Sequence, residues 1–252
     1  MLSAGELPQP SHHAAVVNGS RLSVSKMSTG YRTTPPPRPD MTNGQPQVPH
    51  SYAPPSHPES ESSGPHIQHI WVVTGPAGSG KSTVGEDINN ALKLPFLEGD
   101  DYHPRSNKEK MGAGIPLTDE DRWDWLTSLR EAAVKVLPPS EENHYQPPDG
   151  VVVACSALKR KYRDVVRVAA YECPNVKIHF IYLKLDKEAL YDRLEHRKSH
   201  YMKSGMVNSQ LQILEEPSPT EWDSTTVDAD ASPDVVRQRV RDVVSEKLAE
   251  CQ

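Results

Sequence analysis

The residues best suited to chemistry lie in a glycine-rich turn that follows an apolar run within residues 67–83. The turn matches the pattern G-x-x-x-x-G-K-[ST] through Gly75, Gly80, Lys81 and Ser82. Glycines let successive backbone N–H groups point at a polyphosphate, and a helix N-terminus behind them adds positive potential. The lysine supplies a positive charge beside the β- and γ-phosphates, and the serine hydroxyl suits Mg²⁺. The motif therefore predicts a site for a nucleotide and its metal ion.

The sequence on either side of the turn supports this prediction. A strand-like run at 70–73 precedes the turn, and a run compatible with a helix follows it at 84–92. A ligand-free glycine turn could join the same two elements, but the full motif in this context favours the nucleotide site. We expect nine consecutive residues to contribute to it: Gly75, Pro76, Ala77, Gly78, Ser79, Gly80, Lys81, Ser82 and Thr83.

An acidic cluster with Glu98, Asp100 and Asp101 follows the next strand candidate, Leu94–Leu97. Ligands of an open parallel α/β sheet lie at the carboxyl ends of its strands, so this cluster should face the same crevice as the glycine turn. The alternative is a solvated acidic turn. For phosphoryl transfer to an alcohol, a carboxylate that accepts the hydroxyl proton suffices. We assign the role of base to Asp100, and the metal site to Ser82 and Glu98.

Three cations are candidates for the acceptor side of the crevice. Thr118–Asp121 is a capping box that opens a helix, and a helix that advances about 100° per residue places Arg122 near the centre of the apolar stripe. A buried arginine needs an anion, which is either a carboxylate of the protein or a substrate. Lys159 and Arg163 lie at the edge of the apolar stripe of a later helix. A sugar acid, with hydroxyls for the acids and a carboxylate for the guanidinium, would match these residues.

Two further arginines, Arg193 and Arg197, share the apolar face of a helix that Asp186 caps. Paired cations on an apolar face suggest that a polyphosphate or a base is bound there. We expect residues 200–216 to form a mobile lid. Trp123 and Trp125 are interpreted as packing residues.

The elements that would position these residues alternate between strand and helix. The strand candidates are Ile70–Val73, Leu94–Leu97, Gly150–Ala154, Val176–Leu185 and Thr225–Val227. This alternation predicts an α/β fold, a P-loop three-layer sandwich with a five-stranded parallel sheet, helices on both faces and a lid segment. The polar, proline-bounded stretch 138–149 is interpreted as an inserted loop without catalytic consequence.

Residues 1–66 differ in composition from the rest of the chain. Up to Gly64 they hold eleven of the 24 prolines and no periodic apolar pattern. Such a segment cannot bury enough apolar surface to offset chain ordering, so we expect a disordered extension before one folded domain at 67–252. The extension faintly resembles a mitochondrial transit peptide, but no convincing amphipathic helix forms in it. Docking of its prolines to aromatic-grooved domains is the alternative to an inert tail.

The net charge of −6 falls on the expected folded domain, because the charges of the extension balance. An acidic folded unit argues against nucleic acid or an anionic membrane as the main partner. No apolar run approaches the ~20 residues of a transmembrane helix. Cys155, Cys173 and Cys251 lack C-x-x-C spacing and fit reduced thiols. We expect a cytoplasmic protein whose partners are small molecules, with a homodimer left open.

Several linked motifs resemble the gluconokinase family, a group of small P-loop kinases related to shikimate and nucleoside-monophosphate kinases. In chain order the motifs are Gly75 to Ser82, Glu98-Gly99-Asp100-Asp101-Tyr102-His103-Pro104, Asn107, Lys110-Met111, Gly114-Ile115-Pro116-Leu117, Asp119-x-Asp121-Arg122, Trp125-Leu126, Ala154-Cys155-Ser156-Ala157-Leu158-Lys159, Tyr162-Arg163-Asp164, Arg193, Arg197, His200 to Met202, and Ser209-Gln210-x-x-x-Leu214-Glu215-x-Pro217. The resemblance covers about residues 67–251. The extension and the 138–149 loop are not part of the family pattern.

The resemblance implies ATP as nucleotide, Mg²⁺ as metal, and phosphorylation of D-gluconate to 6-phospho-D-gluconate, which feeds the pentose phosphate pathway. It implies that Lys81, Asp100 and Arg197 act in catalysis, with Arg193 at the nucleotide and Arg197 at the lid. The expected acceptor-binding set is Asp100, His103, Arg122, Ser156, Lys159 and Arg163.

Two other readings compete with this one. A kinase for another small acid, shikimate above all, would carry D-x-D at the second strand end, where this chain has Glu98-Gly99-Asp100. A regulatory nucleotide-binding module without catalysis would have a damaged Lys81, Asp100 or lid arginine, and none is damaged. Both observations favour an active sugar-acid kinase.

Overall fold

The computed structural model describes residues 66–195 and 204–251, so the disorder prediction for the extension and the prediction for Arg197 concern residues outside the described part. The described residues contain one sheet of five parallel strands in the order β2-β3-β1-β4-β5. The strands are β1 (Gln68–Thr74), β2 (Phe96–Glu98), β3 (Gly150–Ala154), β4 (Val176–Lys184) and β5 (Ser224–Asp228). The predicted parallel α/β sheet is confirmed.

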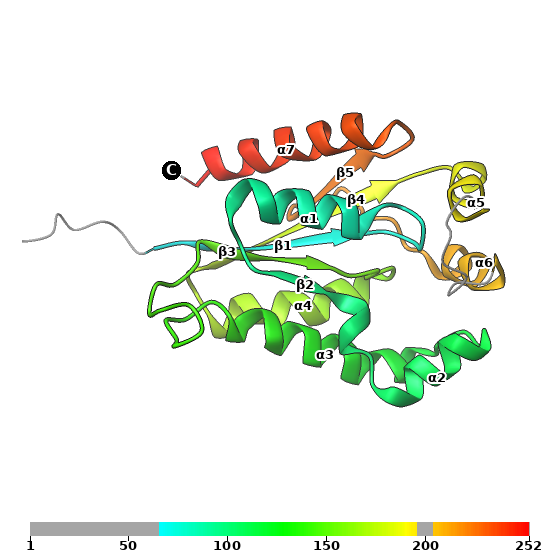
Figure 1. Cartoon of the computed structure of the whole chain (residues 1–252), viewed down its shortest axis with the longest axis horizontal. Coiled ribbons are helices and arrows are strands. Elements are labelled where there is room, and N and C mark those ends of the chain that lie inside the picture. Colours follow the sequence, from blue (N-terminus) through cyan, green and yellow to red (C-terminus); the bar gives the residue numbers. More distant parts are fainter. Residues whose placement is uncertain (1–65, 196–203, 252) are drawn as a thin grey trace, which may run out of the picture. The chain divides into compact units, whose positions relative to one another are not determined.

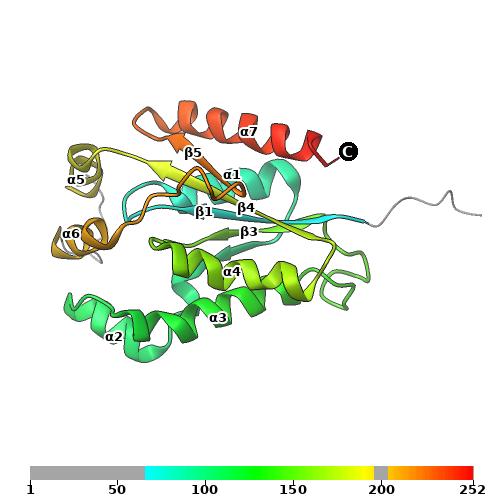
Figure 2. The same cartoon turned by 180° about the vertical axis from the view of Figure 1, so that it is seen from behind.

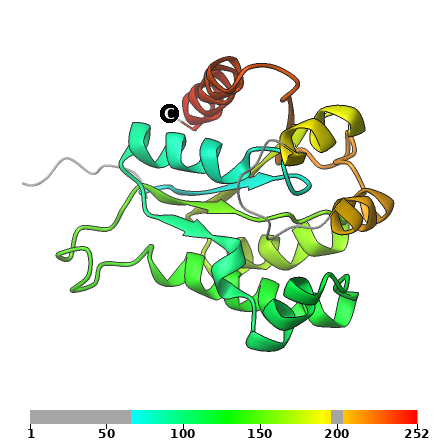
Figure 3. The same cartoon turned by 45° about the vertical axis from the view of Figure 1, so that its right-hand side comes forward.

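Helices cover both faces of the sheet, as Figures 1 and 2 show. One face carries α1 (Lys81–Leu92) and α7 (Pro233–Ala249), and the other carries α3 (Asp119–Lys135) and α4 (Arg160–Glu172). Three shorter helices lie toward the carboxyl ends of the strands (Figure 3): α2 (Arg105–Ala113), α5 (Lys187–Glu195) and α6 (Ser204–Ile213). The short helices therefore surround the end of the sheet where the glycine turn lies.

The core is divided by the sheet because successive strand side chains point to opposite faces. On β1, Ile70 and Val72 pack in the cluster that contains α3 and α4 residues, whereas Trp71 and Val73 pack in the cluster that contains α1 and α7 residues. All of β3 is buried, as expected for a parallel strand covered on both faces. These two apolar layers hold the carboxyl ends of the strands in a fixed arrangement.

Local signals in the sequence explain where the long helices begin. Thr118 accepts a hydrogen bond from the backbone of Asp121, and Asp121 accepts from the backbone of Thr118, which confirms the predicted capping box of α3. Ser232 precedes α7 with a proline in the first turn, but its hydroxyl makes no capping hydrogen bond. Gly80, at φ 96°, is the N-cap of α1, a left-handed conformation that favours glycine.

Two regions differ from the sequence prediction. The turn Gly99–Tyr102 and helix α2 were not predicted, since α2 buries only Asn107 and Met111 and has no apolar stripe.

The loop 138–149 lies at the amino ends of the strands, and Gln68 Nε2 donates to the carbonyls of Leu137 at 2.7 Å and Pro148 at 2.8 Å. Gln68 therefore fixes both ends of that loop.

Among the described helices, none combines the length and the apolar character needed to cross a lipid bilayer.

Candidate active site

Predicted site residues from distant parts of the chain meet at the carboxyl ends of the strands. They line a small hollow of about 50 Å³, which we call the acceptor cleft. Its lining residues are Ala77, Lys81, Asp100, His103, Met111, Pro116, Leu117, Arg122, Trp125, Ser156, Ser209 and Gln210. The structure thus brings the glycine turn, the acidic cluster and the buried arginine of α3 to one place.

The glycine turn adopts backbone angles that only glycine tolerates well. Gly75 and Gly78 have φ values of 147° and 87°. A Cβ on Gly75 would lie 2.8 Å from Ser79 Oγ, and one on Gly78 would lie 3.2 Å from Leu194 of α5. The Lys81 ammonium donates to the Pro76 carbonyl at 2.9 Å across the turn. The turn is therefore a compact loop at the start of α1, as a phosphate-binding loop requires.

The end of β3 holds this loop in place. Thr74 Oγ1 donates to the Ser156 carbonyl at 2.5 Å, and the Gly75 amide donates to the same oxygen at 3.4 Å. Ser79 is buried, and its hydroxyl has no hydrogen-bond partner among the described residues. Because a buried unpaired hydroxyl is unfavourable, the loop has polar capacity that a ligand could use.

The proposed metal residues are hydrogen-bonded neighbours. Burial raises the pKa of the Glu98 carboxyl, while a hydrogen bond with the Ser82 side chain and the charge of Lys81 oppose that rise. A hydroxyl and a carboxylate are oxygen ligands of the kind that Mg²⁺ prefers. The described residues hold no cluster of three or more His, Cys, Asp or Glu side chains suited to a metal. A kinase site does not need one, because phosphates and water supply the other ligands.

Trp125 positions the turn that carries Asp100. Its indole Nε1 donates to the Gly99 carbonyl at 2.7 Å, and the indole ring stacks on His103 at 4.0 Å between ring centroids. Asp100 itself is exposed and lines the cleft. The interpretation of Trp125 as a packing residue was therefore incomplete, because this side chain also orders the acidic turn.

His103 is held as a neutral ring. Burial lowers the pKa of His103 to about 4, with Asp100 opposing this and Arg122 and Lys108 adding to it. Asn107 Nδ2 lies 3.3 Å from His103 Nδ1 and 2.6 Å from the Asp121 carbonyl to which it also donates. If Asn107 donates to Nδ1, the proton of the neutral ring is on Nε2. His103 can then offer a neutral N–H donor to the cleft.

Arg122 is a buried cation at the cleft, and it donates hydrogen bonds to backbone carbonyl groups before and at the start of α3. It is 8% exposed, and its Nη1 donates to the carbonyls of Leu117 at 2.5 Å and Thr118 at 3.1 Å. Its guanidinium lies 5.6 Å from the centroid of the Tyr162 ring. No carboxylate among residues 66–195 and 204–251 forms an ion pair with it. Of the two partners that the sequence allowed, the anionic ligand is the one consistent with this geometry.

The structure does not place Lys159 and Arg163 in the cleft. Lys159 pairs with Asp119 at 2.9 Å, and Asp119 also accepts from Lys161 and Tyr162. These hydrogen bonds, led by the one from Lys161, hold the pKa of the Asp119 carboxyl well below its usual range. Lys159 therefore joins α3 to α4.

Arg163, predicted to bind the acceptor, lies outside the lining of the cleft and is paired within the protein. Arg163 is 1% exposed, and its Nε and Nη2 both donate to Glu221 at 2.7 Å. Its Nη1 donates to the carbonyls of Ala157 and Glu215. With its donors directed at the protein interior, Arg163 is a structural residue.

Arg193 extends from α5 to the loop after β5, where its Nη2 donates to the carbonyls of Ala229 at 2.6 Å and Ala231 at 3.0 Å. It does not line the acceptor cleft. Since α5 packs on the phosphate loop at Gly78, Arg193 stays a candidate for the nucleotide side. Arg197 lies outside the described residues.

Sequence reasoning did not assign a role to two cleft residues of α6, Ser209 and Gln210. Both occur in a motif of the family resemblance, which was the available signal. The amide of Ala77 donates to Gln210 Oε1 at 2.7 Å, so α6 contacts the phosphate loop directly.

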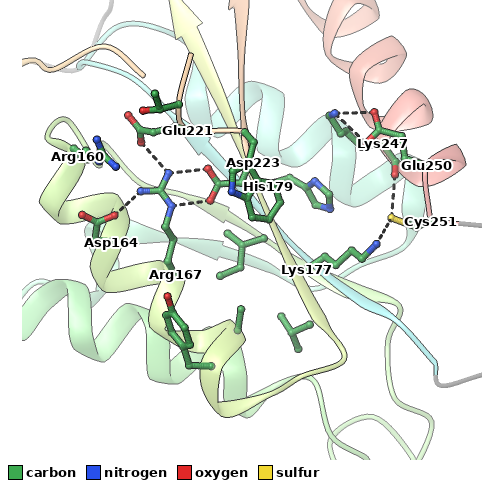
Figure 4. Close-up of a pocket in the computed structure, with 16 residues that line it drawn as sticks. Arg160, Asp164, Arg167, Lys177, His179, Glu221, Asp223, Lys247, Glu250 and Cys251 are labelled. Carbon is green, nitrogen blue, oxygen red and sulfur yellow. Dashed lines mark hydrogen bonds and ion pairs between the residues drawn. The ribbon is translucent and has the colours of Figure 1, made fainter. Parts of the chain in front are cut away.

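A larger hollow, of about 520 Å³, lies between α4, the start of β4 and the end of α7. We call it the Arg167 groove, and Figure 4 shows its charged residues. Arg167 donates to Asp223 through Nε and Nη2 at 2.7 Å, to Glu221 at 2.8 Å and to Asp164 at 2.6 Å. Burial alone would raise the pKa of Glu221, but hydrogen bonds from Arg163 and Arg167 lower it to about 2.

Comparison with known proteins finds relatives of this chain. Residues 72–215 match the family model of an AAA domain. The chain is similar to a probable gluconokinase of Schizosaccharomyces pombe, with 40% identity over 73% of this chain and 91% of the relative. It is similar to the thermoresistant gluconokinase of Escherichia coli, with 40% identity over 66% of this chain and 87% of the relative. A gluconokinase structure from Sinorhizobium meliloti aligns with a TM-score of 0.57 at 40% identity, covering 69% of this chain and 89% of that one.

Proposed function

The chain belongs to the gluconokinase family, and on that premise we propose that it transfers the γ-phosphoryl group of ATP to the 6-hydroxyl of D-gluconate. The observation that carries the proposal is the acceptor cleft, which Lys81, Asp100 and Arg122 line together. Arg122 has no carboxylate partner among the described residues. A phosphate loop, a base and a buried cation are the parts that phosphorylation of a sugar acid needs. The product, 6-phospho-D-gluconate, would enter the pentose phosphate pathway.

In the proposed reaction, the 6-oxygen of gluconate attacks the γ-phosphorus as the bond from that phosphorus to the ADP oxygen breaks. Asp100 accepts the proton of the 6-hydroxyl, since it is the exposed carboxylate that lines the cleft beside the loop. The Lys81 ammonium neutralises charge on the phosphates, which is the main source of catalysis in phosphoryl transfer. Transfer then yields ADP and the phosphate ester.

The acceptor is held at its other end by Arg122. A carboxylate placed against the guanidinium would receive charge-assisted hydrogen bonds in a buried setting. His103 and Ser156 line the same hollow. They can form hydrogen bonds with the hydroxyl groups that lie between the carboxylate and the 6-hydroxyl of gluconate. This arrangement requires an acceptor with a carboxylate and several hydroxyls.

Ser82 and Glu98 would hold Mg²⁺, whose chemistry is to neutralise the β- and γ-phosphates. The influence of the Ser82 side chain on the pKa of Glu98 supports this pairing. We further propose that Thr83 and Arg193 contact the nucleotide, that Arg197 acts at the lid, and that the enzyme works in the cytoplasm without nucleic acid or membrane partners.

The test is formation of ADP by the purified full chain with ATP and Mg²⁺ in the presence of D-gluconate, shikimate, glycerate or no acceptor. We expect turnover with gluconate only. Turnover with shikimate or glycerate alone would replace the proposed acceptor. ADP formation that is independent of any acceptor would contradict a kinase function.

A further inference from the structure

Helix α6 brings one side chain into contact with both the phosphate loop and the acceptor cleft. The Ala77 amide donates to Gln210 Oε1 at 2.7 Å, and Gln210 lines the cleft together with Asp100 and Arg122. An amide side chain has an oxygen at one side and an NH₂ group at the other. Because the loop N–H takes the oxygen, the orientation of the Gln210 amide is set by this hydrogen bond.

The NH₂ group of Gln210 has no hydrogen-bond acceptor in the described part of the chain, so its two donors remain for a ligand. The other polar groups of the cleft are specialised. Asp100 accepts hydrogen bonds, and Arg122 carries a positive charge suited to a carboxylate. A neutral donor that lines the same hollow suits a hydroxyl oxygen, and the acceptor of the proposed function has several hydroxyl groups.

Helix α6 forms part of the wall of the acceptor cleft. Residues from the phosphate loop, α2 and α3 form the walls, and α6 contributes Ser209 and Gln210. Val207 of α6 is fully buried, which ties the helix to the rest of the fold. An acceptor bound in the cleft would therefore contact α6.

We infer that Gln210 is an acceptor-binding residue that determines specificity: its Oε1 is held by the phosphate loop while its NH₂ group donates to one hydroxyl of the sugar acid. This inference rests on the proposed function and adds a residue to its acceptor site. The proposed contact to the hydroxyl and the contact to Ala77 would then belong to the same side chain.

The experiment compares Gln210→Met with Gln212→Met in the full chain. Methionine keeps the length of the side chain and removes both hydrogen-bonding groups. Gln212 is exposed on the same helix, which makes it a matched control. We expect Gln210→Met to raise KM for gluconate about tenfold, because a hydroxyl loses its partner in a buried site. KM for ATP should stay within about twofold, and Gln212→Met should match the wild type.

Gluconate analogues that each lack one hydroxyl separate recognition from a general disturbance of α6. If Gln210 binds one hydroxyl, Gln210→Met should not raise KM for the one analogue that lacks that hydroxyl, because the interaction is already absent. An equal penalty for all analogues, an equal rise in KM for ATP, or no change in KM for gluconate would overturn the inference. Gln210→Asn, which shortens the amide, provides the same readout if Gln210→Met does not fold.

The two levels of the proposal fail differently. If the wild-type protein does not phosphorylate gluconate, the proposed function is overturned, and the inference with it. If the wild type is active and Gln210→Met behaves like Gln212→Met, the inference alone is overturned.

Discussion

The acceptor cleft and the Arg167 groove contain similar residue types in opposite states of pairing. The groove is the larger hollow, at about 520 Å³ against about 50 Å³, and it holds an arginine surrounded by carboxylates. Arg167 donates to Asp164, Glu221 and Asp223, so its charge is already balanced by the protein. In the cleft, Arg122 donates to the backbone carbonyls of Leu117 and Thr118 and has no carboxylate partner among the described residues, and Asp100 is exposed.

The state of pairing of the buried arginine, rather than the volume, therefore distinguishes the proposed site from the groove. A buried cation with its carboxylates in place stabilises the fold, whereas a buried cation without one is poised to bind an anion. Variants that separate kinetic effects from stability effects test the comparison.

The largest effect is expected for Asp100→Asn. Removing the group that accepts the hydroxyl proton should lower kcat by about 10²–10⁴-fold, the usual contribution of a general base. Binding of ATP, measured by titration with a non-hydrolysable analogue, should be unchanged. Asp101→Asn is the control, since this exposed neighbour offers only its backbone carbonyl to Lys108. Retained turnover in Asp100→Asn would remove this residue as the base.

A substitution in the Arg167 groove should lower the free energy of unfolding rather than the catalytic rate. Glu221→Ala leaves the buried Arg163 without its carboxylate, and loss of one partner of a buried ion pair destabilises by about 3–5 kcal/mol. We expect a fall in Tm of about 10 °C. Initial rates per folded molecule at low temperature should change less than twofold. A specific loss of gluconate affinity in this variant would break the distinction between groove and cleft. The exposed Glu246→Ala is the control.

Arg122→Ala should act on the acceptor. Charge-assisted hydrogen bonds are worth about 1.5–3 kcal/mol, so KM for gluconate should rise about 10- to 100-fold. KM for ATP should stay within about twofold, as measured by varying each substrate at saturating levels of the other. If the rise is the same for both substrates, Arg122 does not bind the carboxylate.

A smaller kinetic effect is expected for Trp125→Phe, and none for Trp222→Phe. Trp125→Phe keeps an aromatic ring against His103 but loses the hydrogen bond to Gly99, so kcat should fall about three- to tenfold while the fold is retained. Trp222→Phe in the groove should have no kinetic effect, because Trp222 is 87% exposed. Steady-state kinetics of the two variants side by side provide the measurement. Equal behaviour would contradict the positioning role of Trp125.

The smallest effect concerns the protonation of His103. Burial lowers the pKa of His103 to about 4 in the folded protein, below the 6.5 of the unfolded chain. The unfolded state therefore takes up this proton first, and the associated stability is complete above about pH 6.5 and is lost as the pH falls toward 4. Histidine NMR, with His103→Gln to identify the signal, should show no titration of His103 near pH 6.5. A midpoint near 6.5 would show that the ring is solvated.

The sequence predicted features that depend on short-range patterns. The phosphate loop follows from the spacing of its glycines, lysine and serine, and the burial of Arg122 follows from its helical phase. The ion pair of Arg163 was not predicted, because its partner, Glu221, is 58 residues away and no local pattern indicates the pair. Helix α2 was missed because polar contacts of Asn107, rather than an apolar stripe, attach it to α3.

The hydrogen bonds of Gln68 have a practical consequence for the loop 138–149. Because Gln68 fixes the carbonyls at Leu137 and Pro148, the loop begins and ends at set points at the amino ends of the strands, away from the cleft. Doubling the length of a flexible loop costs only about 0.6 kcal/mol in closure entropy. A fluorescent domain inserted between Glu141 and Glu142 would therefore make a labelled enzyme with its catalytic residues undisturbed.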